Sequence, residues 1–144
     1  MTTAANISGW KFYLGSTASP QVLAAIEEVY SVTNVGRTNQ LVEVTNFDSP
    51  VGTKEYIAGL AEGDEITVEC NYIPKAATAP VQLVAMVAVE AGSTRLCRLE
   101  YTISSPIKRF SFSAVCLSYS VVPSPTERNA LRFGFKISGA ITRT

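Results

Sequence analysis

Hydrophobic and polar residues alternate along much of the chain, with the period of two that is typical of β-strands. The clearest case is residues 65–73, EITVECNYI, where one face is apolar and the other polar. The apolar face is Ile66, Val68, Cys70 and Tyr72, and the polar face is Glu65, Thr67, Glu69 and Asn71. This pattern predicts a strand that is buried on one side only.

Residues 130–141 alternate in the same way. Their apolar face is Leu131, Phe133, Phe135, Ile137 and Ile141, opposite Arg132, Gly134, Lys136 and Ser138. Shorter strands are predicted at residues 9–14, 40–47, 54–59 and 95–103. Residues 29–35 are rich in β-branched side chains, which favour strands. The segment before them begins like a helix, with Ser19 as N-cap and Pro20 at the first helical position. Whether residues 20–28 are helix, loop or strand stays open.

The alternation changes phase within residues 110–121. Phe110, Phe112, Ala114 and Cys116 fall on one side, and Val115, Leu117, Tyr119 and Val121 fall on the other. Two explanations fit this pattern. Either a β-bulge lies near Ala114, or both faces are buried, the second against another subunit.

One segment predicts a helix. Residues 80–91 begin with Pro80, contain no turn residues, and are followed by Gly92. The helix is apolar on most sides, so it requires cover from the mouth of a sheet sandwich or from a neighbouring subunit. Residues 122–130 form a polar, proline-containing loop between two long strands. We therefore expect a mainly β fold, a sandwich or barrel with one short α-helix packed on it, in a single domain over residues 1–144.

Composition adds a hint of assembly. Charged residues make up 17% of the chain and hydrophobic residues 47%, whereas ordinary globular proteins have roughly 25% charged residues. The shortage of charge fits a surface that meets other protein chains, or a slightly apolar monomer. Acidic residues gather between residues 43 and 69, and basic residues gather from residue 95 onward. The two segments could stack head to tail on copies of the chain, or pair within one fold.

Several function classes are disfavoured. The net charge of zero argues against binding nucleic acid by neutralising phosphates. The chain has no histidine, and its three cysteines lack CxxC spacing, so we predict no catalytic residues, no cofactor-binding residues and no metal ligands. Glu65 and Glu69 would lie roughly 13 Å apart on a strand, which is too far for a glycosidase pair. No signal peptide or bilayer-spanning run is evident, and we expect synthesis in a cytoplasm that keeps the thiols reduced.

The segment NFDSPVGTKEYIAGL, residues 46–60, combines acids, a lysine and turn-forming residues, and we predict an extended loop there. Asp48 and Ser49 are expected to fix a turn by accepting hydrogen bonds from backbone N–H groups. The wider segment 43–74, EVTNFDSPVGTKEYIAGLAEGDEITVECNYIP, resembles the signature segment of the major tail tube proteins of long-tailed, siphovirus-type bacteriophages. The resemblance rests on a V-T-x-x-D-S turn, a K-E-Y-I run, G-L, a G-D-E turn and a closing N-Y-x-P. Family members often carry proline before G-L, where this chain has Ala58.

The resemblance implies a structural virion protein of the split β-barrel type, without enzymatic activity or cofactor. Six copies would form a ring, and stacked rings would form the hollow tube through which DNA is ejected. Tape-measure, tail terminator and baseplate or tip proteins are the implied partners. The loop would pack one subunit against the next through Asn46, Phe47, Asp48, Ser49, Pro50, Val51, Gly52, Thr53, Lys54, Glu55 and Tyr56.

DNA must slide through such a tube without sticking, so a neutral or acidic lining suits the channel. Glu65, Thr67, Glu69 and Asn71 are the candidates for this lining, with the outer wall of the tube as the alternative location. Arg132 and Lys136 could neutralise the two acids if both strands lie in one sheet. The alternative functions are a tube subunit of a contractile tail or tail-like secretion system, and a small β-barrel binding module.

Overall fold

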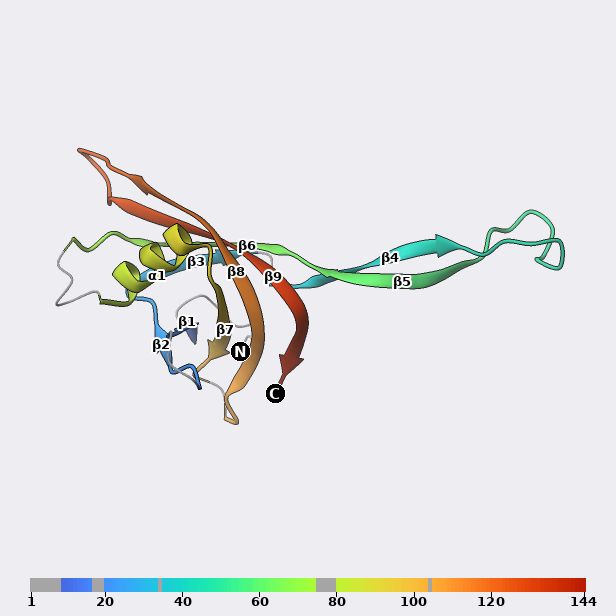
Figure 1. The fold of residues 1–144 in the computed structure, drawn as a ribbon, viewed down its shortest axis with the longest axis horizontal. Coiled ribbons are helices and arrows are strands. Elements are labelled where there is room, and N and C mark those ends of the chain that lie inside the picture. Colours follow the sequence, from blue (N-terminus) through green and yellow to red (C-terminus); the bar gives the residue numbers. More distant parts are fainter. Residues whose placement is uncertain (1–8, 17–19, 34, 75–79, 104) are drawn as a thin grey trace, which may run out of the picture.

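The computed structural model describes residues 9–16, 20–33, 35–74, 80–103 and 105–144 (Figure 1). Its strands are β1 (Trp10–Gly15), β2 (Leu23–Ala25), β3 (Val29–Thr33), β4 (Arg37–Glu43), β5 (Tyr56–Gly63), β6 (Glu65–Asn71), β7 (Thr94–Tyr101), β8 (Lys108–Val122) and β9 (Ala130–Arg143). The helix α1 spans Pro80–Ala91. Seven strands form one sheet in the order β2-β1-β7-β8-β9-β6-β3, while β4 and β5 pair only with each other.

The large sheet curls until its two halves face each other, because β8 and β9 are long and bend strongly (Figure 1). The ring of Phe12 on β1 stacks on Phe135 of β9 with 5.5 Å between centroids, although β7 and β8 separate the two strands in the sheet. Both rings are fully buried. The mainly β sandwich predicted from the alternation is therefore confirmed, and its core lies between the two halves of one sheet.

The two clearest alternating segments form β6 and β9, and they pair with each other in antiparallel register. Every predicted inward position from Ile66 to Cys70 and from Leu131 to Ile137 is at most 3% exposed. The polar positions between them face outward, which is the arrangement that a half-buried sheet requires.

A β-bulge explains the phase change in β8. Cys116 pairs with Phe135 and Ser118 pairs with Gly134, so Leu117 is an extra residue on β8. Beyond this bulge Tyr119 and Val121 face the same side as their partners Phe133 and Leu131. The bulge was predicted near Ala114, and the β8–β9 pairing is irregular on both sides of that residue, between Ser111 and Ser113 and between Cys116 and Ser118. Ala114 keeps its inward place because its small side chain fits the core with no exposed surface.

The helix predicted over residues 80–91 is α1, and Gly92 ends it with the positive φ of 64° that favours glycine. Its first turn is held by a side chain from outside the helix. The Glu27 carboxylate accepts hydrogen bonds from the backbone N–H groups of Val81 and Gln82, at 3.0 and 3.1 Å. Gln82 is itself buried, and its amide joins the backbone of Glu27, Asn71 and Ile73. These bonds fasten α1 across the sheet.

The helical start considered for residues 20–28 does not form. Residues 23–25 are the edge strand β2, which pairs with residues 13–15 of β1, and a turn follows. Ser19, the proposed N-cap, lies outside the described residues. Strand pairing satisfies the backbone here and leaves Glu27 free to cap α1 instead.

The hairpin β4–β5, together with its connecting residues, projects from the body as a long arm (Figure 1). Its root is tightly built. A Cβ atom at Gly63 would lie 2.5 Å from Ile137 Cβ, so only glycine permits this approach. The N–H of Asp64 donates to the Gly36 carbonyl at 3.0 Å, and the Asp64 carbonyl accepts from Ile137 at 3.2 Å. The arm therefore leaves the sheet in a defined direction.

Candidate subunit-contact surfaces

The arm is a projecting element whose apolar side chains have no cover. All seven residues of β4 are exposed, and so is β5 except for Gly63. Its exposed large hydrophobic residues are Leu41, Val42, Val44, Phe47, Val51, Tyr56, Ile57 and Leu60. A two-stranded hairpin is marginal in water without packing partners. Exposed apolar surface of this kind marks sites where another molecule packs.

The tip of the arm is residues 44–55, between the two strands. It holds its shape through local hydrogen bonds. Ser49 Oγ accepts from the backbone N–H of Asn46 at 3.0 Å and donates to the Glu55 carboxylate at 3.0 Å. Asn46 Oδ1 accepts from the N–H of Asp48 at 2.8 Å. The turn role predicted for Ser49 is thus confirmed, whereas Asn46 performs the role predicted for the Asp48 side chain. Residues 56–60 of the predicted loop belong to β5.

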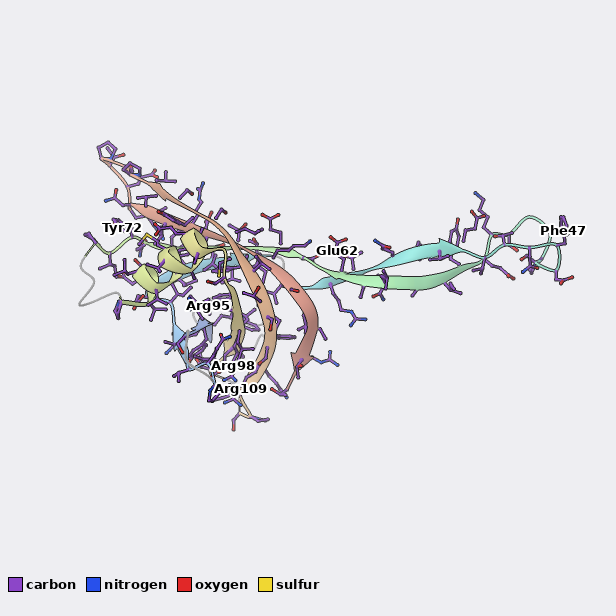
Figure 2. All side chains as sticks on the ribbon, in the orientation of Figure 1. Phe47, Glu62, Tyr72, Arg95, Arg98 and Arg109 are labelled. Carbon is purple, nitrogen blue, oxygen red and sulfur yellow. The ribbon has the colours of Figure 1, made fainter. Side chains whose placement is uncertain are left out.

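Two apolar side chains at this tip, one aromatic and one aliphatic, are completely exposed to solvent. Phe47 and Val51 have relative exposures of 108% and 103%, and Figure 2 shows Phe47 at the far end of the arm from Glu62. Burying a side chain of this size gains about 1.5–3 kcal/mol. A tip that is prebuilt by hydrogen bonds and presents such residues is suited to insertion into a partner.

The polar face of β6 carries charges in pairs. Glu69 Oε1 lies 2.9 Å from Arg132 Nε on the neighbouring strand β9. Lys136 Nζ lies 3.1 Å from Glu62 Oε1 at the root of the arm, and Lys136 pairs in register with Glu65. Thr67 stands opposite Gly134, and the side-chain amide of Asn71 donates to Glu28 at 3.3 Å. The acids named from the sequence therefore sit beside bases, and the face is close to neutral.

Besides the edge strand β2, the four-stranded part β8-β9-β6-β3 of the sheet has an open edge on each side. β3 has β6 as its only strand partner among the described residues. On the other side, the pairing of β7 with β8 ends at Thr94 and Val115, so from Leu117 onward β8 has β9 as its one strand partner in the part of the chain that the structure describes. The sheet β8-β9-β6-β3 consequently has a free edge at residues 117–122 and another at residues 29–33. Free edges of this kind pair readily with further strands.

Apolar side chains also emerge on α1 and on the free part of β8. Leu83, Val84 and Val87 on the helix are 41–52% exposed. Leu117, Tyr119, Val121 and Val122 on the strand are 36–47% exposed. The Tyr119 hydroxyl donates to the Glu90 carboxylate of α1 at 2.9 Å, and this bond raises the pKa of the tyrosine. Helix and strand thus present neighbouring parts of one partly apolar surface.

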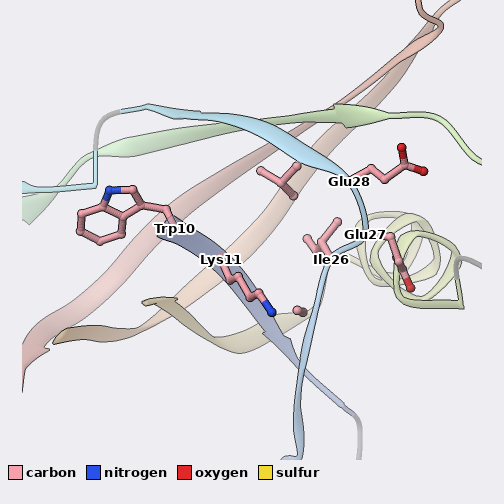
Figure 3. Close-up of a pocket in the computed structure, with 7 residues that line it drawn as sticks. Trp10, Lys11, Ile26, Glu27 and Glu28 are labelled. Atoms are coloured by element: carbon pink, nitrogen blue, oxygen red, sulfur yellow. The ribbon is translucent and has the colours of Figure 1, made fainter. Parts of the chain in front are cut away.

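The groups most able to do covalent chemistry are sequestered. Burial raises the pKa of Cys70 to about 12, and burial also raises the pKa of Cys97 and of Cys116. A thiol with such a pKa is protonated near neutral pH and is a poor nucleophile. A pocket of about 350 Å³ between β1 and the β2–β3 turn contains Lys11, Glu27 and Glu28 (Figure 3). Glu27 is already committed to capping α1.

Within the described part of the chain, no group of three or more Cys, Asp or Glu side chains could hold a metal ion. α1, the helix of this part, is not long and apolar enough to cross a bilayer.

The sequence matches no protein-family model and no curated protein. Solved structures, by contrast, are similar over nearly the whole chain. The chain superposes on the tail of an empty gene transfer agent (GTA) particle, computed with helical refinement and C6 symmetry, with a TM-score of 0.72 and 16% identity. That match covers 98% of this chain and 99% of the other.

Two further structures extend the likeness to other machines. The SPP1 tail tube matches with a TM-score of 0.70 and 11% identity, covering 94% of this chain and 76% of that one. The sheath–tube complex of the PVC extracellular contractile injection system, in its extended state, matches at 0.67 and 10%, covering 99% and 92%. At these identities the matches establish the fold, and the chain has the fold found in phage tail tubes and in related injection systems.

Proposed function

We propose that the chain is the repeating subunit of a bacteriophage tail tube, which polymerises as stacked hexameric rings and forms the channel for DNA ejection. The observation that carries this proposal is a tail-tube fold with two free edges on one sheet and an uncovered arm. Neither feature stabilises a monomer, whereas a tube subunit requires both to contact its neighbours. The role is structural and non-enzymatic.

Ring closure follows from the two free edges. They lie on opposite sides of the sheet β8-β9-β6-β3, so residues 29–33 of one copy can pair with residues 117–122 of the next. This contact joins unlike surfaces, and repeating it generates a ring or a filament. Pairing also removes the exposed backbone groups that would otherwise invite aggregation. The C6 symmetry used for the GTA tail supports a ring of six.

The arm supplies the second kind of contact. Residues 46–55 of its tip, together with Tyr56 at the start of β5, pack against a neighbouring copy and bury the apolar residues that the monomer exposes. Tubes built in this way also meet a tape-measure protein, a tail terminator and baseplate or tip proteins. The finished assembly belongs to the virion tail, after synthesis in the host cytoplasm.

The channel lining is the face of β6 that carries Glu65, Thr67, Glu69 and Asn71. Ion pairing makes this face nearly neutral rather than acidic, which still suits DNA that slides without binding. We propose replacing Glu65 and Glu69 with lysine in the phage, with Glu127→Lys in the exposed β8–β9 loop as the control. Slowed DNA ejection from intact tails, in the double variant alone, is expected. Unchanged ejection kinetics would place this face on the outer wall.

A contractile tail or tail-like secretion system is the second candidate, because the PVC sheath–tube complex shares the fold. A sheath gene beside the gene for this chain would favour it over the siphovirus-type tail.

Electron microscopy of the concentrated protein tests the proposal itself. Hexameric rings or hollow tubes are expected, either spontaneously or on a tail nucleus. A species that stays small and discrete at every concentration, on a nucleus as well, would instead indicate a binding module.

A further inference from the structure

A groove lies at the root of the arm, where the open end of the sandwich meets the β3–β4 connection. It has a volume of about 550 Å³ and is lined by Val35, Gly36, Arg37, Phe110, Ile141 and Arg143. Its apolar part is Val35, Phe110 and Ile141. None of the six lining residues carries a side-chain carboxylate, and Asp64 Oδ2 lies close behind Gly36. Within the described residues, neither guanidinium has a carboxylate within ion-pair distance.

The tip of the arm has the complementary chemistry. Phe47 and Val51 are uncovered apolar side chains, and the acids near them are Asp48 and Glu55 in the tip and Glu43 at the end of β4, against Lys54 alone. An apolar anchor surrounded by acids matches an apolar groove bordered by arginines, because each charge then finds its opposite as it leaves water.

The tip cannot reach the groove of its own chain. Arg37 lines the groove and is also the first residue of β4. The groove therefore lies at one end of the arm, and Phe47 lies at the other (Figure 2). The seven residues of β4 alone separate them by roughly 23 Å, and the pairing with β5 keeps the arm extended. The occupant of the groove is therefore another copy of the chain, displaced by about one arm length.

We infer that the arm tip of one subunit docks in the groove at the arm root of a neighbouring subunit, with Phe47 as the anchor and Arg37 and Arg143 facing the acids of the tip. Each subunit offers one tip and one groove, so the contact joins unlike surfaces and can be repeated from copy to copy. This inference rests on the proposed assembly and specifies the surface that receives the arm.

Disulfide trapping tests the contact between copies. Protein carrying Phe47→Cys is mixed before assembly with protein carrying Ile141→Cys. The natural cysteines do not interfere, because all of them are at most 2% exposed. Val22→Cys, at an exposed position outside the groove, replaces Ile141→Cys in the control mixture. A disulfide-linked dimer is expected in tubes from the first mixture only.

The outcomes separate this inference from the proposed function. Tubes in which Phe47→Cys is not linked to Ile141→Cys, or is linked as readily to Val22→Cys, overturn the docking site and leave the tube subunit standing. The same holds if Phe47→Cys reacts with a different protein of the tail. If wild-type protein forms no tube under any condition, both the docking site and the proposed tube-subunit function are contradicted.

A charge exchange provides a second test that does not depend on cysteine variants assembling. Asp48→Arg and Arg143→Glu should each raise the critical concentration for assembly by about tenfold, and together they should restore it, because the facing charges are opposite again. Lys11→Glu, at an exposed position on β1, is the matched partner for the control. Failure of the double variant to recover, or equal recovery with Lys11→Glu, contradicts the docking geometry.

Discussion

The body of this protein buries large apolar residues in its core, whereas the arm exposes its large apolar residues. In the body, Phe12 and Phe135 stack across the two halves of one sheet with no exposed surface. In the arm, Phe47 stands entirely uncovered at the far end of a hairpin whose strands pair only with each other and that meets the body at its root. The first arrangement stabilises a single chain. The second leaves apolar surface in water until another molecule covers it. This exposed surface is therefore the clearest sign of assembly in the structure.

Removing the arm should have the largest effect on this contrast. We expect that replacing residues 38–62 with a short turn abolishes tube formation while the body keeps its fold, because the core lies outside this segment. The smaller deletion of residues 49–53 should also block assembly. Circular dichroism measures the fold and electron microscopy the tubes. Normal tubes from either variant would show that the arm is surface decoration.

A matched pair of phenylalanines sharpens the comparison. Phe135→Ala should lower the free energy of unfolding by about 3–5 kcal/mol, because it opens a cavity in a closely packed core. Phe47→Ala should change it by less than about 0.5 kcal/mol, since the side chain is already in water. Urea unfolding of the unassembled protein gives both values. A large loss from Phe47→Ala would mean that the arm stabilises the monomer.

The body also depends on one buried polar side chain. Gln82→Ala should destabilise the protein by about 1–3 kcal/mol, since the backbone groups of Glu27, Asn71 and Ile73 lose their hydrogen-bond partner. Gln40→Ala is the control in the exposed strand β4, and it should be nearly neutral. Thermal unfolding distinguishes them, and equal shifts in Tm would contradict the difference between body and arm.

The thiols should make the body, and not the arm, sensitive to alkali. Cys70 has its pKa raised from 9.0 to about 12 in the folded protein, so the folded state holds this proton to higher pH than the unfolded state. The resulting stability is complete below pH 9 and is lost as the pH rises toward 12. Unfolding measured between pH 7 and 11 should show this decline, and Cys70→Ala should reduce it while the contributions of Cys97 and Cys116 remain. Deleting the arm should leave the pH dependence unchanged, since all three cysteines lie outside residues 38–62.

The smallest effect concerns the surface ion pair on the polar face. Glu69→Gln should cost about 0.2–1 kcal/mol, because Glu69 and Arg132 are 25% and 50% exposed in their side chains. High salt should reduce that difference further. A loss above 2 kcal/mol in urea unfolding would show that this face is buried and organised like the core.

Much of the body could be predicted because its signals are local and strong. The strict alternation of residues 65–71 defines β6, and Pro80 with Gly92 brackets α1. The position of the bulge in β8 could not be predicted, because a phase change fixes only that an extra residue exists. Its location at Leu117 depends on the register with β9.

The arm was harder to anticipate for a physical reason. Leu41, Ile57 and Leu60 have the apolar character of core residues, so strands were predicted on both sides of the loop without any sign that they leave the body. A sequence does not distinguish residues that are buried by folding from residues that are buried by assembly. The groove at the arm root combines residues from β3–β4, β8 and β9, and no local pattern could bring these together.

A cryo-electron microscopy reconstruction of the assembled tube tests the central claim most directly. The account predicts a hollow ring-stacked tube in which residues 29–33 of one copy lie beside residues 117–122 of the next, and in which Phe47 is covered by a neighbouring subunit. A particle in which these strand edges remain open and the arm projects into solvent would contradict it.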